Sequence, residues 1–99
     1  DPLVTRTYVE ERLKLKVVEV PAGKRIVAGA GTELILRAGS ATVVDSQSGG
    51  LCDVTDGVDL RKGTRAPGNH LLIAPRDDGR GLLAENQVIV LVRGDYRIE

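Results

Sequence analysis

The sequence predicts an all-β protein, a compact small barrel or sandwich with an N-terminal arm, and three observations support this class. The apolar residues are almost all aliphatic, since the 99 residues include no Phe, Trp or Met and two Tyr. Val and Ile favour strands. The 12 Gly and 4 Pro suit many tight turns. Short apolar runs recur between these turns, as in a sandwich or barrel with a single core.

The chain opens with a segment that differs from the rest. We divide the sequence into 1–12, an N-terminal arm or short helix, and 13–99, a single β domain. Pro2 favours an extended start, while Thr5 suits the cap of a short helical turn, so both conformations remain open. The apolar side chains of the arm precede the strand pattern and are the expected subunit interface: Leu3, Val4, Tyr8 and Val9.

The first strand is expected from residue 13 to Val20. Leucines and valines alternate here with lysines, which is the period of a half-buried strand. The alternation changes face at Val17–Val18. A change of this kind inside a strand predicts a bulge or bend.

Three more strands are expected in the first half of the chain, at 25–28, 32–37 and 41–45. The second and third of these flank the turn Ala38-Gly39-Ser40. A short loop that contains glycine between two strand patterns predicts a hairpin.

The second half begins with residues 46–62, the least regular stretch, to which no strand is assigned. The strand pattern returns at Asn69–Ala74, which contains a continuous apolar run. Residues 87–93 form the most apolar strand, and 96–99 add a short one. Between the strands at 69–74 and 87–93, Asp78-Gly79 is a strong hairpin signal.

Charge and composition bear on the classes of partner. The 14 basic and 14 acidic residues give zero net charge, and aromatic residues for stacking on bases are scarce. Nucleic-acid binding is therefore not expected, because phosphate contacts need a basic excess. No apolar run reaches the about 20 residues of a membrane span.

The lone cysteine and histidine are the candidates for nucleophilic catalysis. No protease signature surrounds Cys52 or His70, so we expect no enzyme and no catalytic residue. A free cysteine is usually buried, and a buried, inert Cys52 is favoured over pairing between chains.

An acidic loop is the candidate for metal binding. Asp53, Asp56 and Asp59 recur at every third residue around Gly57, but the calcium-binding spacing of an EF-hand is absent. The turn-forming role of Asp and Gly is favoured, so no metal and no cofactor is assigned, while calcium remains the alternative. Arg80 is expected to bridge carbonyls or carboxylates across its turn.

Three stretches carry a resemblance: DPLVTRTYVEERL, GTELILRAG and the segment from DLRKGTRAPGNHLLIAPRDDGRG to RGDY. Together they resemble small exported proteins of spore-forming Gram-positive bacteria. The resemblance implies export, with removal of a signal peptide near Asp1, and carries over no catalytic residue. A second likeness, through Val20-Pro21-Ala22-Gly23, is to β-clip domains.

Two functional hypotheses follow. The first is a non-enzymatic extracellular or cell-surface structural protein, a filament or surface-layer subunit, that forms homo-oligomers through its N-terminal arm. An apolar arm can add to the sheet edge of a neighbour. The alternative is a monomeric module that binds a small ligand or a cell-wall component. Its candidate site is the polar loop set Asp53, Asp56, His70, Asp77 and Arg80.

Overall fold

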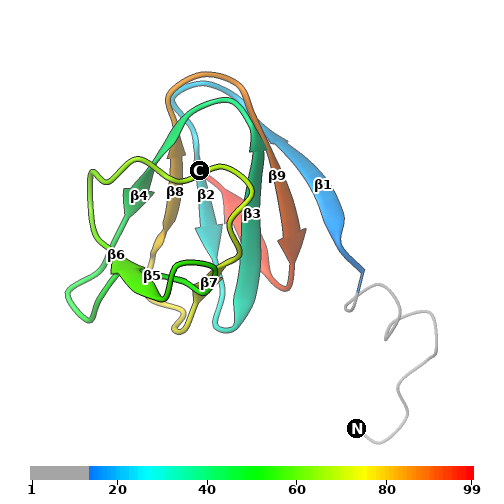
Figure 1. Ribbon diagram of the computed structural model, residues 1–99. Coiled ribbons are helices and arrows are strands. Elements are labelled where there is room, and N and C mark those ends of the chain that lie inside the picture. Colours follow the sequence, from blue (N-terminus) through cyan, green and yellow to red (C-terminus); the bar gives the residue numbers. More distant parts are fainter. Residues whose placement is uncertain (1–13) are drawn as a thin grey trace, which may run out of the picture.

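The protein is an all-β sandwich of ten strands in two antiparallel sheets (Figure 1), which confirms the predicted fold class. The computed structural model describes residues 14–99. The predicted arm or short helix at 1–12 lies outside the described residues, and so do the interface residues predicted on it, Leu3, Val4, Tyr8 and Val9. Within residues 14–99, no helix is long and apolar enough to cross a membrane.

The larger sheet has six strands. In spatial order they are β1 (Lys16–Val20), β9 (Val88–Arg93), β3 (Thr32–Ala38), β7 (Leu72–Ala74), β5 (Leu51–Asp53) and β6 (Val58–Leu60). The smaller sheet has four strands, in the order β10 (Tyr96–Ile98), β2 (Arg25–Ala28), β8 (Gly81–Ala84) and β4 (Ala41–Val44).

The chain crosses repeatedly from one sheet to the other. Strands β1 to β4 alternate between the sheets, and so do β7 to β10. The hairpins predicted at Gly39 and at Asp78-Gly79 are therefore wrong: β3 pairs with β7 and β9, whereas β4 pairs with β8. A turn signal shows where the chain reverses, but it does not show whether the next strand pairs or crosses to the other sheet.

Inward-facing aliphatic side chains from both sheets form the core between them. It consists of Val18, Val20, Ile26, Ala28, Leu34, Leu36, Ala41, Val43, Leu51, Leu60, Ala66, Leu72, Ala74, Leu82, Ala84, Val88, Val90 and Val92, with Tyr96 packed against it. Alternate residues of each strand supply this set, as the pleat of a strand requires.

Three strands were missed in the sequence, and β8 is the most instructive. Gly81 resembles the end of a turn, yet it is the first residue of a strand inside the small sheet. A Cβ at this position would lie 1.9 Å from the carbonyl oxygen of Ile26 on β2. Glycine is required because the two backbones approach closely. Strands β5 and β6 have three residues each, too few to show a period.

The bulge predicted at Val17–Val18 is also wrong. Five consecutive residue pairs join β1 to β9 without a shift, from Lys16↔Val92 to Val20↔Val88. Val18 and Val20 point into the core, whereas Val17 points outward and is 69% exposed. The change of alternation therefore marks a strand that is apolar on both faces.

The edges of the two sheets differ. The segment 63–66 runs along β4, where the N–H of Val43 donates to Thr64 O and the N–H of Ala66 donates to Ala41 O. At the other side of the molecule (Figure 1), β1 is the last strand of the large sheet, and its outer edge pairs with no other described strand. Unpaired edges are available for pairing with another chain.

Candidate functional site

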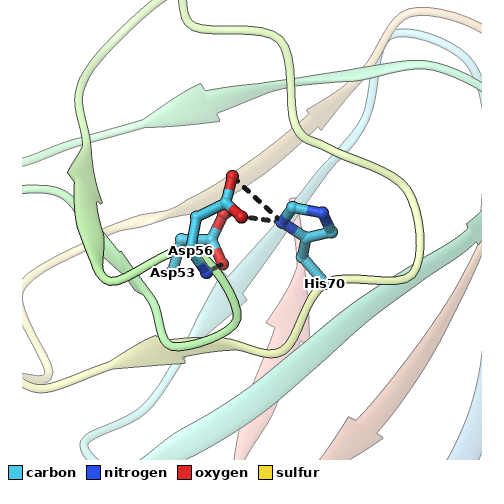
Figure 2. A group of neighbouring side chains, drawn as sticks. All are labelled: Asp53, Asp56 and His70. Carbon is cyan, nitrogen blue, oxygen red and sulfur yellow. Dashed lines mark hydrogen bonds and ion pairs between the residues drawn. The ribbon is translucent and has the colours of Figure 1, made fainter.

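Within residues 14–99, Asp53, Asp56 and His70 form the one cluster of three or more side chains that could hold a metal ion. Asp53 ends β5, Asp56 lies in the turn before β6, and His70 lies just before β7. The turn and the segment before β7 lie side by side, so the three side chains converge (Figure 2). Their candidate ligand atoms all lie within 4.8 Å of one another.

The Asp53 carboxylate is buried, and each of its oxygens accepts a hydrogen bond. Its Oδ2 lies 2.8 Å from His70 Nδ1, and its Oδ1 accepts a hydrogen bond of 3.1 Å from the N–H of Asp56. Burial raises the pKa of Asp53, but the hydrogen bonds from His70 and Asp56 outweigh it, so the pKa lies below its usual value. Asp53 is therefore ionised at neutral pH.

His70 is held by the same contact. The hydrogen bond to Asp53 raises the pKa of His70 above its usual value, and the Asp56 carboxylate, 3.9 Å from Nδ1, adds to this. With Asp53 ionised, the ring donates its Nδ1–H to Asp53, since a carboxylate only accepts hydrogen bonds. Folding therefore favours the protonated ring.

Backbone contacts surround this cluster and indicate its structural role. The N–H of Val54 donates to Leu71 O at 2.9 Å, and the N–H of Leu71 donates to Thr55 Oγ1 at 2.9 Å. These bonds and the Asp53–His70 contact tie the β5–β6 turn to the segment before β7. A divalent cation could use His70 Nδ1 as a ligand only if this nitrogen lost its proton and the hydrogen bond to Asp53 opened, because a protonated ring nitrogen has no lone pair to offer.

The structure divides the predicted polar loop set into separate places. Asp53, Asp56 and His70 come together, as expected. Asp77 instead lines a shallow pocket of about 150 Å³ with Tyr96 and Arg97. Arg80 belongs to a third group.

Asp59 also lies apart from Asp53 and Asp56. Its Oδ2 is 3.4 Å from the N–H of Gly50, and its charge acts on Arg80. The expected spacing of three aspartates therefore yields no shared oxygen cage. A strand begins at Val58 and takes Asp59 out of the turn that holds Asp56.

Arg80 is the largest fully buried side chain of the described region, with 2% exposed. Its Nε and Nη2 donate to the two carboxylate oxygens of Asp78 at 2.7 and 2.6 Å, and its Nη1 donates to Gly50 O at 2.6 Å. The predicted bridging role is confirmed. Ser46 Oγ also donates to Asp78 Oδ2, at 2.7 Å, so the group joins the loop before β5 to the turn before β8.

The sequence did not single out Asp78 as a functional residue, although Asp-x-Arg within one turn allows this fork-shaped pairing. The hydrogen bonds from Arg80 and Ser46 hold the pKa of Asp78 far below its usual range. With every buried donor and acceptor satisfied, this group stabilises the fold and leaves no atom aimed at a ligand.

The expectation of a buried Cys52 is wrong, since Cys52 is exposed. Its neighbours Leu51 and Asp53 point inward, and the pleat of β5 turns the thiol outward. Cys52 also does not belong to the His70 cluster, so the described residues contain no Cys–His pair of the kind that activates a thiol.

The outer face of the large sheet is apolar around β9. Val17 on β1, Leu91 on β9 and Ile35 on β3 are directly opposite one another and form a row across three strands. The Cβ atoms of opposite residues lie about 4.5–5.5 Å apart, so the row is continuous. Ile89, half-buried and two residues from Leu91, lies on the same face of β9, and Leu15, 39% exposed, lies just before β1 and two residues from Val17. We call these residues the outer patch: Leu15, Val17, Ile35, Ile89 and Leu91.

Polar pairs border the outer patch along the strands. On one side Arg93 Nη1 lies 3.8 Å from Glu33 Oε2. On the other side Gln87 Nε2 donates to Glu19 Oε1 at 3.1 Å. An apolar centre with a polar rim is the usual anatomy of a protein–protein interface.

No family model, no curated protein and no solved structure matches this chain. The resemblance to exported proteins of spore-forming bacteria therefore stays a prediction.

Proposed function

We propose that this protein is a non-enzymatic structural protein that acts outside the cell or at its surface and assembles with copies of itself through its N-terminal arm. A filament or surface layer is the expected product. One observation carries the proposal: the arm runs directly into β1, the open edge strand of the large sheet, where Leu15 and Val17 are exposed. Monomeric proteins usually protect such edges.

The magnitudes favour an apolar contact over backbone pairing alone. Fixing the backbone of one residue costs about 1–2 kcal/mol of conformational entropy, and one hydrogen bond contributes about 0.5–1.5 kcal/mol. The net free energy of backbone pairing alone is therefore close to zero. Burial of a large apolar side chain contributes about 1.5–3 kcal/mol. Contact between the four apolar residues of the arm and the exposed apolar residues around β1 would bury several large side chains, each with a contribution of this size.

Two further observations agree with a role in assembly. The zero net charge removes long-range repulsion between copies. The polar clusters of the described region, around His70 and Arg80, are satisfied within the protein and hold loops together. The location outside the cell is an expectation from the sequence resemblance.

Light scattering on the full chain tests the proposal. The native protein is expected to form species much heavier than 10.6 kDa in a concentration-dependent way. A variant with Leu3, Val4, Tyr8 and Val9 all changed to Ser is expected to be monomeric, while a control with Thr5 and Thr7 changed to Ser should assemble normally. A native chain that stays monomeric at high concentration rules out the proposal.

A groove on the small sheet favours a second candidate, the monomeric binding module. The groove measures about 370 Å³ and is lined by Arg25, Thr42, Val44, Lys62 and Leu83, among others. In its lining, the cationic residues Arg25 and Lys62 outnumber the one acidic residue, Asp45, so a groove of this size suits a small anionic ligand. A monomeric chain whose amide resonances at Val44 and Gly63 shift with added inorganic phosphate would support this candidate, and Arg25→Gln should weaken the shift.

A further inference from the structure

We propose that the outer patch of the large sheet is the receptor for the arm, and that the arm comes from a neighbouring copy. Residues 3–9 of one chain would cover Val17, Leu91 and Ile35 of the next. This inference rests on the proposed function and assigns the surface on which the arm docks.

The outer patch is not needed for packing within the described part of the chain. On the inner face of the same three strands, the core is already filled by Val18, Val90 and Leu36. Antiparallel strands with one solvated face usually carry polar residues there. Here three aligned positions on that face hold Val, Leu and Ile.

The length and end point of the arm favour it as the occupant. Residues 1–13 end two residues before Leu15, at the edge of the outer patch. A fully extended chain of this length reaches at most about 43–47 Å, while the strands from β1 to β3 span about 10 Å. The arm therefore has the reach to cross the patch, and it supplies two apolar pairs, Leu3-Val4 and Tyr8-Val9.

The sequence before β1 favours a neighbouring copy over the arm's own sheet. To cover the patch of its own chain, the arm would have to reverse direction just before Leu15. Residues 3–20 contain no Gly, Pro, Asn, Asp or Ser, the residues that form tight turns. An arm that continues away from its own sheet places its apolar residues on the next copy.

Disulfide trapping between two populations of the full chain tests the inference. Both carry Cys52→Ser, because the native thiol is exposed. One population also carries Tyr8→Cys, and the other carries Leu91→Cys. The control partner carries Leu83→Cys, a leucine that is half-buried like Leu91 but lies in the small sheet.

Under mild oxidation, the Tyr8–Leu91 pair is expected to give at least about tenfold more covalent heterodimer than the Tyr8–Leu83 pair, because docking raises the effective thiol concentration. Equal yields would overturn the inference. A single chain with both Tyr8→Cys and Leu91→Cys that closes within itself, and stays at monomer mass, would also overturn it.

Light scattering on the same samples before oxidation separates the two proposals. If the chain assembles but Tyr8 does not trap Leu91, the docking surface is wrong and the proposed function stands. If the native chain is monomeric, both fail. Where Leu91→Cys itself prevents assembly, Ile89→Cys on the same strand replaces it, and failure of Ile89→Cys to trap Tyr8 in an assembled sample overturns the inference.

Discussion

The two sheets of the sandwich differ in how the described chain protects them. In the small sheet, segment 63–66 covers the edge of β4. Ile26 and Ala28 of β2 face the core, yet Val27, on the other face of the same strand, is also buried, with 3% exposed. At β1 the large sheet has no such cover within residues 14–99, and Val17 is 69% exposed. The β4 side of the small sheet is covered within the monomer, whereas the β1 side of the large sheet is open.

This difference separates residues whose identity follows from packing within the domain from residues whose identity does not. In the small sheet, even a glycine has a packing reason, as the contact between Gly81 and Ile26 shows. In the open region, the packing of the described domain does not account for the outer patch. Apolar surface that the domain does not use is the usual mark of an interaction site.

The largest effect is expected from Gly81→Ala, which tests the small sheet. The new Cβ would lie 1.9 Å from Ile26 O, so β2 and β8 must separate. The free energy of unfolding should fall by at least about 3 kcal/mol, as for severe overpacking of a core. Urea denaturation measures this.

Gly68→Ala is the matched control, because its nearest contact would be Leu36 O at 3.9 Å. It should change the free energy of unfolding by less than about 0.5 kcal/mol. Similar stability for the two variants would show that the small sheet is not closely packed at Gly81.

A smaller loss is expected from Arg80→Met, which removes the buried bridge between two loops. Gly50 O and the Asp78 carboxylate lose the hydrogen bonds that Arg80 donates, while Asp78 keeps the one from Ser46. This should cost about 2–4 kcal/mol in the free energy of unfolding. Arg61→Met is the control, since Arg61 pairs with Asp45 at the surface and is 55% exposed. Its cost should be at most about 1 kcal/mol. Equal costs would mean that burial of Arg80 is unimportant.

Val17→Thr tests the open region. Thr keeps the strand preference but adds a hydroxyl, so we expect association to weaken by about tenfold while the free energy of unfolding changes by less than about 0.5 kcal/mol. Sedimentation and urea denaturation give the two values. Val18→Thr, one residue along the strand and 8% exposed, should destabilise the monomer instead. Loss of monomer stability in Val17→Thr would place Val17 in the fold's own packing.

The smallest effect concerns the Asp53–His70 contact, which lies within the large sheet. Because folding raises the pKa of His70 above its usual 6.5, its contribution to stability is complete below that pH and is lost as pH rises through the raised pKa. His70→Gln should flatten the fall in stability as the pH rises above about 6.5, measured by urea denaturation. An unchanged pH profile would mean that the contact does not couple to folding.

Local patterns predicted much of this molecule. The strands at 25–28, 32–37 and 87–93 agree closely with β2, β3 and β9, because alternation and turn residues are local signals. The bridging role of Arg80 was also predictable, since its carboxylate partner Asp78 is two residues away. Of the candidate site, Asp53, Asp56 and His70 were predicted to lie together, but the predicted set wrongly included Asp77 and Arg80.

The all-β class, the aliphatic core and most of the strands could be read from the sequence, because they depend on side-chain period and composition. Three properties came from the fold alone: which sheet each strand joins, the outward position of Cys52, and the alignment of Val17, Leu91 and Ile35 in one row on the outer face. Those properties depend on pairing between strands far apart in the chain, and a period of two residues does not say which face meets the core.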